Sequence, residues 1–150
     1  IAFRAGADAV VVLGIGSDNK IREAVSEAIR RDKAIIVDLI QVEDPLGRLE
    51  DLVKKMRGME NWIAFCLHKG ISEHIRSRGI YRDEDLIKTA RKIAEGFVLS
   101  VAGGIKEGTA GKVIASGADI CVVGSAIYNS KDPKETTKRI LEEMRRFRSS

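Results

Sequence analysis

Two short apolar runs in the second half of the sequence both stop at glycine, a pattern suited to binding an anion. The first run ends at Gly103 and Gly104, and the second ends at Gly124 beside Ser125. Glycine lacks a Cβ atom, so it leaves backbone N–H groups uncovered and adopts φ angles that other residues avoid. Such N–H groups bind phosphate where a helix follows. We interpret these four residues as a phosphate-binding site; the alternative is that they are only turn residues.

A histidine and an aspartate occur in two other apolar runs. His68 ends the run WIAFCLH, and a histidine at the end of a strand can act as a general acid–base near neutral pH. Asp38 interrupts IIVDLI, where a carboxylate without a polar partner would be costly, so we expect it to face a polar interior. Both are candidate catalytic residues. A purely structural, capped role is the alternative for His68.

Five apolar runs must position these residues. They are rich in β-branched residues and nearly continuous, which is typical of strands covered on both faces in a parallel sheet. The runs span residues 7–14, 33–40, 61–68, 96–104 and 118–127. Helical spacing of apolar residues is found between them, at Ile21, Val25, Ala28 and Ile29, then Leu46, Leu49, Val53 and Met56, then Leu86, Ala90, Ile93 and Ala94, with a short stripe at Val113 and Ile114. Strand and helix therefore alternate.

The alternation predicts an α/β fold built from repeated βα units. Such units suit either a doubly wound sheet or part of a (β/α)₈ barrel, and in both architectures function collects at the carboxyl ends of the strands. Five units cannot close an eight-stranded barrel, and the sequence opens at Ile1 within what resembles the end of a helix. We therefore expect residues 1–150 to form the carboxyl-terminal five βα units of one (β/α)₈ TIM barrel domain, without its first three strands.

Composition narrows the range of partners. The 150 residues carry a net charge of +4 that is spread along the chain, and no aromatic and basic platform accompanies it, so we expect no nucleic-acid partner. Cys66 and Cys121 lie in apolar runs and are expected to be buried thiols in a reducing compartment. The apolar runs are too short to cross a bilayer and no signal peptide is visible, so we expect a cytoplasmic protein without a membrane partner.

Four sequence words, VDLIQVEDP, LHKGI, VAGGI and GADICVVGSAI, occur together and in order. As a set they resemble the 3-hexulose-6-phosphate synthase family, which belongs to the ribulose-phosphate-binding barrels of the orotidine-5′-phosphate decarboxylase superfamily. The resemblance implies a lyase that joins formaldehyde to ribulose 5-phosphate or catalyses the reverse cleavage, with Mg²⁺ as cofactor and a homodimer as the assembly. The resemblance also implies that His68 transfers the proton and that Asp38 lines the sugar-binding site. The phosphate would bind at Gly103, Gly104, Gly124 and Ser125.

Related families differ at positions within these words. The 3-keto-gulonate 6-phosphate decarboxylases typically have Glu at the position of Asp38, Thr at Ala102, and Arg at both Ile71 and Ser125. Ribulose-phosphate 3-epimerases carry an acid at the position of Ala102, and orotidine-5′-phosphate decarboxylases usually carry an arginine at Ser125. These differences favour the synthase.

One part of the family pattern is missing. The word D-x-K-x-x-D and the metal-binding acids of the family do not occur in this chain, so we expect no metal ligand here and little or no activity from the chain alone. The alternative function is a non-catalytic phosphate-binding or assembly module.

Overall fold

A computed structural model describes residues 1–69 and 84–148. In this part of the chain, five parallel strands form one sheet: β1 (Ala9–Leu13), β2 (Ala34–Asp38), β3 (Ile63–His68), β4 (Val98–Ala102) and β5 (Ile120–Val122). The strands lie side by side in the order in which they occur in the sequence. A doubly wound sheet reverses its direction of growth at a switch point. The uninterrupted order therefore identifies the barrel type of winding.

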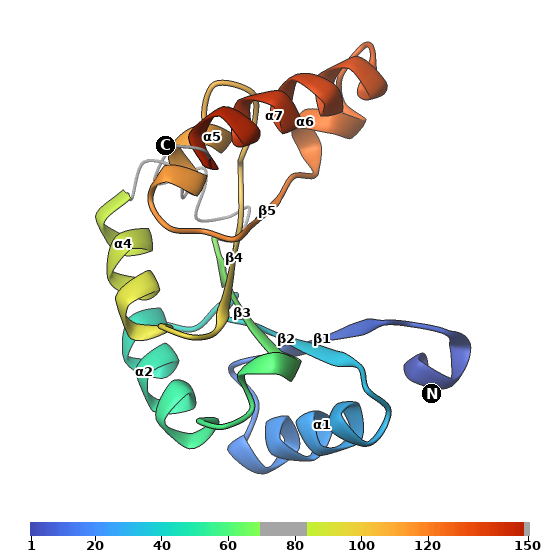
Figure 1. Cartoon of the computed structure of the whole chain (residues 1–150), viewed down its shortest axis with the longest axis vertical. Coiled ribbons are helices and arrows are strands. Elements are labelled where there is room, and N and C mark those ends of the chain that lie inside the picture. The colour runs from blue at the N-terminus through green and yellow to red at the C-terminus, as the bar shows by residue number, and fades with distance from the viewer. Residues whose placement is uncertain (70–83, 149–150) are drawn as a thin grey trace.

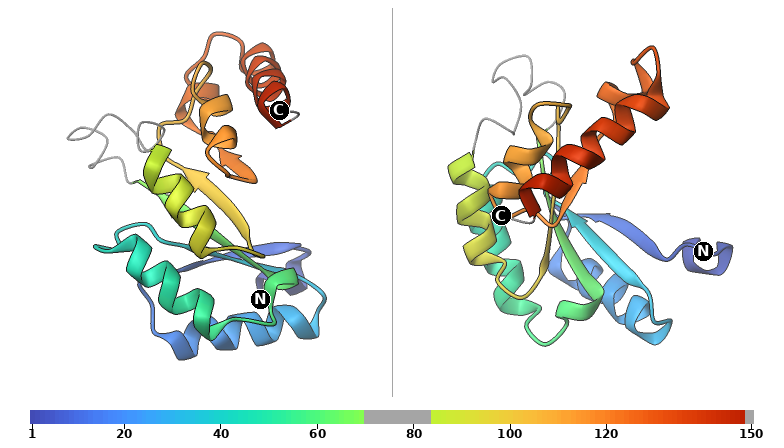
Figure 2. Two further views of the ribbon diagram at one scale, coloured as in Figure 1. Left: turned by 60° about the vertical axis from the view of Figure 1, so that its left-hand side comes forward. Right: turned by 45° about the horizontal axis from the view of Figure 1, so that its top comes forward.

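Helices cover the outer side of this curved sheet, as Figures 1 and 2 show. The helices are α1 (Asp18–Arg30), α2 (Pro45–Lys55), α4 (Glu84–Ile93), α5 (Ala110–Ala115), α6 (Ser125–Tyr128) and α7 (Pro133–Arg148), with short 3₁₀ turns η1 (Ala2–Ala5) and η2 (Glu60–Trp62). Each of α1, α2, α4 and α5 leads from one strand to the next. This alternation confirms the βα units expected from the sequence.

The helix boundaries follow local capping chemistry. Asp44 Oδ1 accepts a hydrogen bond from Gly47 N at 3.0 Å, and Pro45 occupies the first helical position of α2. Asp132 Oδ1 accepts from Glu135 N at 3.0 Å in the same way at the start of α7. Most residues of the predicted apolar stripes are buried. In α4, however, the buried side chain is Ile87, whereas the predicted Leu86 is only half-buried.

The last strand is shorter than the sequence predicts. We expected a strand over 118–127, but β5 ends at Val122 and α6 begins at Ser125. Gly124 precedes this helix, and its carbonyl accepts hydrogen bonds from Ile127 N at 2.8 Å and Tyr128 N at 3.2 Å. The backbone of residues 124–127 (GSAI) therefore forms a helical turn. Its hydrogen-bonding groups cannot at the same time extend the pairing of β5 with β4.

The sheet has an inner face that remains partly open in the described chain. On the outer face, residues such as Val37, Phe65 and Leu99 are fully buried against the helices. On the inner face, Leu13 of β1 is 54% exposed and Val122 of β5 is 50% exposed. The expected burial of both faces therefore holds for most of β3 and β4, at the centre of the curved sheet, and not for the two outermost strands.

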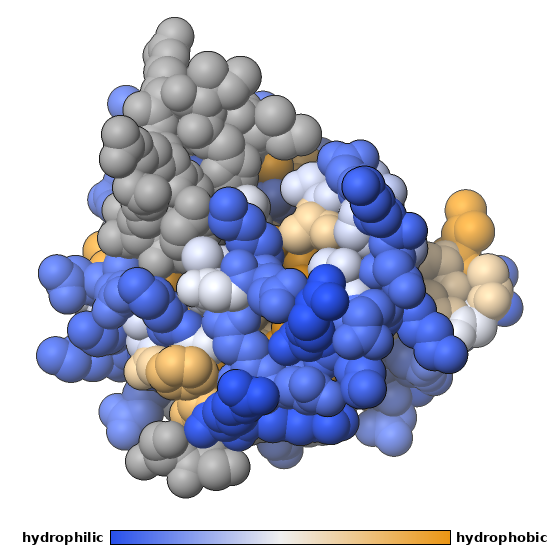
Figure 3. All heavy atoms as spheres, turned by 90° about the horizontal axis from the view of Figure 1, so that it is seen from above, coloured by the Kyte–Doolittle hydropathy of each residue, from blue (hydrophilic) through white to orange (hydrophobic). Residues whose placement is uncertain are grey.

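The described helices were compared with the length and hydropathy that a membrane span requires. No helix within residues 1–69 or 84–148 is both long and apolar enough to cross a bilayer. In the view of Figure 3, the coloured part of the surface is mostly hydrophilic, with apolar side chains in smaller areas.

Candidate functional site

The two candidate catalytic side chains lie in contact at the carboxyl edge of the sheet. Asp38 is the last residue of β2 and His68 is the last residue of β3. The Oδ2 atom of Asp38 is 2.9 Å from Nδ1 of His68. The other carboxylate oxygen, Oδ1, accepts a hydrogen bond from Ile40 N at 2.9 Å. Both oxygens of Asp38 therefore have polar partners, which satisfies the expectation that it faces a polar environment.

The register of the parallel strands explains this contact. Asp38 pairs with Cys66, and His68 stands two residues further along β3. Because side chains alternate between the faces of a strand, Asp38, Cys66 and His68 all point to the inner face. The Asp38 carboxylate is 14% exposed and the His68 ring is 30% exposed, so the pair lies at the rim of the inner face, where a ligand could reach it.

This geometry equips His68 for proton transfer. When the Nδ1–H group donates to Asp38 Oδ2, the ring is held in one orientation and Nε2 keeps its lone pair. An imidazole oriented by a carboxylate is a recurrent general-base arrangement. The Asp38–His68 pair can therefore take a proton from a substrate and return it.

Cys66 lies beside this pair but does not offer a nucleophile. Burial, and then the negative charge of Asp38, raises the pKa of the Cys66 thiol to about 12, although a hydrogen bond with Ser100 acts in the opposite direction. Cys66 and Ser100 are 3% and 2% exposed. The thiol thus stays neutral at physiological pH. Both cysteines are free thiols, and Cys66 is buried as expected, whereas Cys121 on the short strand β5 is only half-buried.

The candidate phosphate-binding residues follow two neighbouring strands. Ala102 of β4 pairs with Val122 of β5, so the segments after these strands leave the sheet side by side. Gly103 and Gly104 have φ angles of 116° and 66°, which glycine adopts without strain. In the described part of the chain, no protein acceptor takes a hydrogen bond from the N–H groups of Gly103, Gly104, Gly124 or Ser125. Phosphate binding at these groups stays a prediction.

A glutamate from the last helix supports the segment after β4. Glu143 Oε1 accepts from Gly111 N and Glu143 Oε2 accepts from Gly108 N, both at 2.7 Å. A Cβ atom on Gly111 would lie 2.3 Å from the Phe147 ring, so α7 packs directly on α5. Figures 1 and 2 show the two helices side by side. Sequence reasoning missed Glu143, because a glutamate on a charged helix gives no local sign of a contact 32 and 35 positions away.

The described residues show no cluster of side chains that fits the implied Mg²⁺. Within residues 1–69 and 84–148, no group of three or more His, Cys, Asp or Glu side chains is placed to hold a metal ion. Asp38, which contacts His68, has a polar partner at each carboxylate oxygen. Ile71, which the sequence comparison contrasts with an arginine, lies outside the described residues.

Comparison with known proteins finds similarity over most of this chain. A profile of the orotidine 5′-phosphate decarboxylase / HUMPS family matches residues 1–140. A 3-hexulose-6-phosphate synthase from Staphylococcus haemolyticus is 34% identical over 139 residues, which cover 92% of this chain and 62% of that protein. The chain therefore spans less than two thirds of the length of such relatives.

Solved structures show the same likeness in three dimensions. The 3-hexulose-6-phosphate synthase from Salmonella typhimurium superimposes with a TM-score of 0.82 at 28% identity, over 97% of this chain and 65% of that chain. The 3-keto-L-gulonate-6-phosphate decarboxylase from Vibrio cholerae has a TM-score of 0.76 at 19% identity, over 97% of this chain and 64% of that chain, a likeness of fold alone.

Proposed function

Because the chain belongs to the orotidine 5′-phosphate decarboxylase / HUMPS family, we propose that it contributes five βα units to an aldehyde lyase. The reaction would join formaldehyde to ribulose 5-phosphate, giving 3-hexulose 6-phosphate, or run in the reverse direction. The observation that carries the proposal is the 2.9 Å contact between Asp38 and His68 at the carboxyl edge of the sheet. The relatives named 3-hexulose-6-phosphate synthase support the choice of substrates.

In this proposal His68 moves the proton. Its Nε2 atom takes a proton from the carbon next to the ketone of ribulose 5-phosphate, and the electron pair moves to the ketone oxygen. The ketone re-forms as this carbon bonds to the carbon of formaldehyde, the π bond of formaldehyde opens towards its oxygen, and that oxygen takes up the proton held by His68. Asp38 keeps the imidazole oriented and stabilises its protonated form.

The amides after β4 and β5 hold the substrate in place. The N–H groups of Gly103, Gly104, Gly124 and Ser125 would bind the phosphate, which leaves the ketone end of the sugar free to approach His68 on neighbouring β3. The resemblance also implies Mg²⁺ and a homodimer. Since no described set of residues fits the metal, we assign no step of the reaction to it.

An assay of the complete gene product that contains this sequence tests the proposal. With Mg²⁺ present, ribulose 5-phosphate should cause formaldehyde to disappear at the rate at which hexulose phosphate forms. Parallel assays for decarboxylation of 3-keto-gulonate 6-phosphate and for 3-epimerisation of ribulose phosphate serve as controls. Activity in either control, without consumption of formaldehyde, would contradict the assignment. The mass of the native protein tests the homodimer.

A second candidate function is a non-catalytic binding or assembly module. The observation in its favour is the exposure of apolar side chains on the inner face, including Val11 at 57% and Val122 at 50%. Edge strands such as β1 and β5 also offer unpaired backbone groups to another chain. A module of this kind would bind sugar phosphate and associate without consuming formaldehyde, whereas a monomer that binds no sugar phosphate would contradict both candidates.

A further inference from the structure

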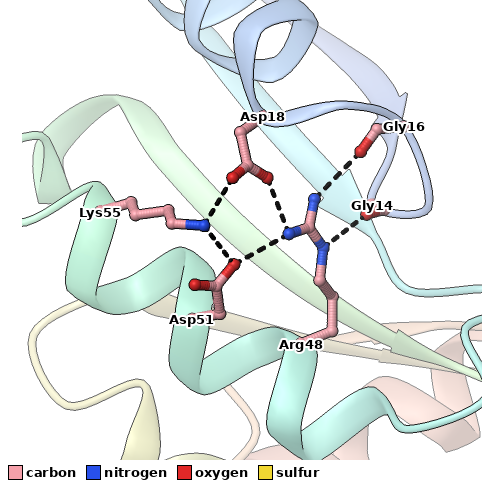
Figure 4. Close-up of polar contacts among 6 residues, drawn as sticks. All are labelled: Gly14, Gly16, Asp18, Arg48, Asp51 and Lys55. Carbon is pink, nitrogen blue, oxygen red and sulfur yellow. Dashed lines mark hydrogen bonds and ion pairs between the residues drawn. The ribbon is translucent and has the colours of Figure 1, made fainter.

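Arg48 connects the first turns of α2 to the segment that follows β1. Its Nε atom donates to Gly14 O at 2.9 Å, and its Nη2 atom donates to Gly16 O at 3.0 Å. Figure 4 shows these bonds as two prongs of one planar guanidinium. The side chain is 20% exposed, so the bonds are largely shielded from water. We call residues 14–17 the β1 loop.

Two carboxylates and a second cation hold the guanidinium from the other side. Arg48 Nη1 lies 2.7 Å from Asp18 and 2.9 Å from Asp51, and Lys55 Nζ bridges the same carboxylates at 2.5 and 2.7 Å. Hydrogen bonds from Lys55 and then from Arg48 hold the pKa of Asp18 below its usual value. The two cations balance the two anions, so Arg48 is fixed in one orientation by a neutral cluster (Figure 4).

The β1 loop is bonded in turn to the backbone of Asp38. Gly14 N donates to Asp38 O at 2.7 Å. A Cβ atom on Gly14 would lie 2.7 Å from Leu39 Cδ2 and 3.1 Å from Asp38 O, so the loop and the end of β2 approach as closely as glycine permits. Asp38 holds His68 through its side chain. A continuous set of hydrogen bonds therefore runs from Arg48 through Gly14 and Asp38 to His68.

We propose that Arg48 is a positioning residue that acts on His68 through the β1 loop and Asp38. By holding the carbonyls of Gly14 and Gly16, it keeps the Asp38 backbone in the position from which the carboxylate orients the imidazole. This inference rests on the proposed function of His68. Only arginine has the rigid planar fork that reaches two carbonyls and a carboxylate at once, whereas a lysine presents one compact ammonium group.

Three variants of the complete gene product test this role. Arg48→Met removes the charge and the fork, and Arg48→Lys removes only the fork. Lys55→Met is the matched control, because it removes one positive charge from the same cluster and no bond to the loop. If Arg48→Met fails to fold, Arg48→Lys carries the test, because it keeps the charge.

The first readout is independent of catalysis. Native-state hydrogen exchange at Gly14 N reports the bond to Asp38 O. We expect exchange to become about tenfold faster in both Arg48 variants, since each loses hydrogen bonds made by a charged donor. In Lys55→Met we expect a change below about threefold, as for other partly exposed ion pairs.

The second readout separates positioning from general stability. Both Arg48 variants should lower kcat by roughly 10–100-fold, the usual cost of losing an orienting partner. KM for ribulose 5-phosphate should change less than about threefold, because the candidate phosphate amides follow β4 and β5, away from Arg48. The ring-nitrogen signal of His68 in ¹⁵N-histidine-labelled protein should move in Arg48→Met and stay in place in Lys55→Met.

The outcomes distinguish this inference from the function on which it rests. Unchanged Gly14 exchange in Arg48→Met, restoration of kcat by Arg48→Lys, or equal effects of Lys55→Met would overturn it. Faster exchange with unchanged kcat would also overturn it, because Arg48 would then only stabilise the loop. If the unaltered protein consumes no formaldehyde, the proposed function fails. The positioning role of Arg48 is then tested by the His68 ring-nitrogen signal, and an unmoved signal in Arg48→Met would reject it.

Discussion

Asp38 binds His68 with one carboxylate oxygen and the backbone of its own strand end with the other. Oδ2 lies 2.9 Å from His68 Nδ1, and Oδ1 accepts from Ile40 N at 2.9 Å. A carboxylate fixed at both oxygens has little freedom to rotate, so it fixes the ring that it contacts. The catalytic predictions below depend on this geometry.

Replacing His68 by alanine removes the group to which we assign proton transfer. We expect kcat of the complete protein to fall by about 10²–10⁴, the usual contribution of a positioned general base. The dissociation constant for ribulose 5-phosphate should change much less, because the phosphate amides are untouched. Steady-state kinetics and calorimetric titration measure the two quantities. An unchanged kcat would make His68 a structural residue.

Replacing Asp38 by asparagine keeps the shape of the side chain and removes its charge. The amide stabilises the protonated imidazole less well and favours the other tautomer of the neutral ring, so we expect kcat to fall by roughly 10²–10⁴ while the fold is retained. The control is Asp8→Asn, which removes an aspartate whose carboxylate is 90% exposed and pairs with Lys33 before the start of β1. Equal kinetics for the two variants would argue against any role of Asp38 in orienting His68.

Replacing Gly124 by alanine tests the phosphate site. An added Cβ would have Tyr128 Cε1 as its nearest neighbour, at 3.7 Å, which is an ordinary contact. We therefore expect little change in the thermal midpoint, but crowding of one amide should weaken ribulose 5-phosphate binding about tenfold, the value of one charge-assisted hydrogen bond. Titration with ribulose 5-phosphate and with inorganic phosphate measures this loss. Unaltered affinity for both ligands would place the phosphate elsewhere.

The buried thiol of Cys66 predicts a loss of stability in alkali. Burial and the charge of Asp38 raise the pKa of Cys66 to about 12 in the folded protein, whereas an unfolded cysteine ionises at about 8.5. Between these values the unfolded chain binds fewer protons, so the free energy of unfolding falls with rising pH by roughly 1.4 kcal/mol per pH unit.

A control variant that lacks only the Cys66 thiol isolates this effect. Urea unfolding at pH 8 and pH 10 should show a smaller loss in Cys66→Ala than in the unaltered protein, by about 2 kcal/mol. The Cys121 thiol, whose pKa burial and then Glu143 raise to about 11, contributes in the same direction and remains in both proteins. An identical pH dependence with and without Cys66 would show that its thiol ionises normally in the fold.

Much of the fold could be predicted from the sequence, because it depends on local signals. Apolar runs and helical stripes predict the five strands and the helices between them, and Asp44-Pro45 predicts the start of α2. The ends of the runs also predict that Asp38 and His68 lie at one edge of the sheet. The expectation of a barrel rather than a doubly wound sheet also comes from these βα units, the resemblance agrees with it, and the strand order confirms it.

Other features depend on contacts that leave no local pattern. Arg48 is one of many charged residues on the helices, and only the folded chain shows that it reaches Gly14, 34 positions away. Glu143 is similar, since nothing in its helix distinguishes it from Glu142. The apolar inner positions of β1 and β5 predict burial, but burial also requires a neighbour on that side. Such features depend on three-dimensional proximity, which periodicity does not encode.

The support that Glu143 and Phe147 give to the segment after β4 has a consequence for how the protein is made. The residues they hold, Gly108 and Gly111, leave the ribosome well before the helix that stabilises them. During synthesis, the segment after β4, which begins with the candidate phosphate-binding residues Gly103 and Gly104, therefore lacks the support of Glu143 until the final turns of α7 are made. A premature stop codon ahead of Glu143 would leave all five described strands in the chain. It would remove the side chain that bonds Gly108 and Gly111 after β4.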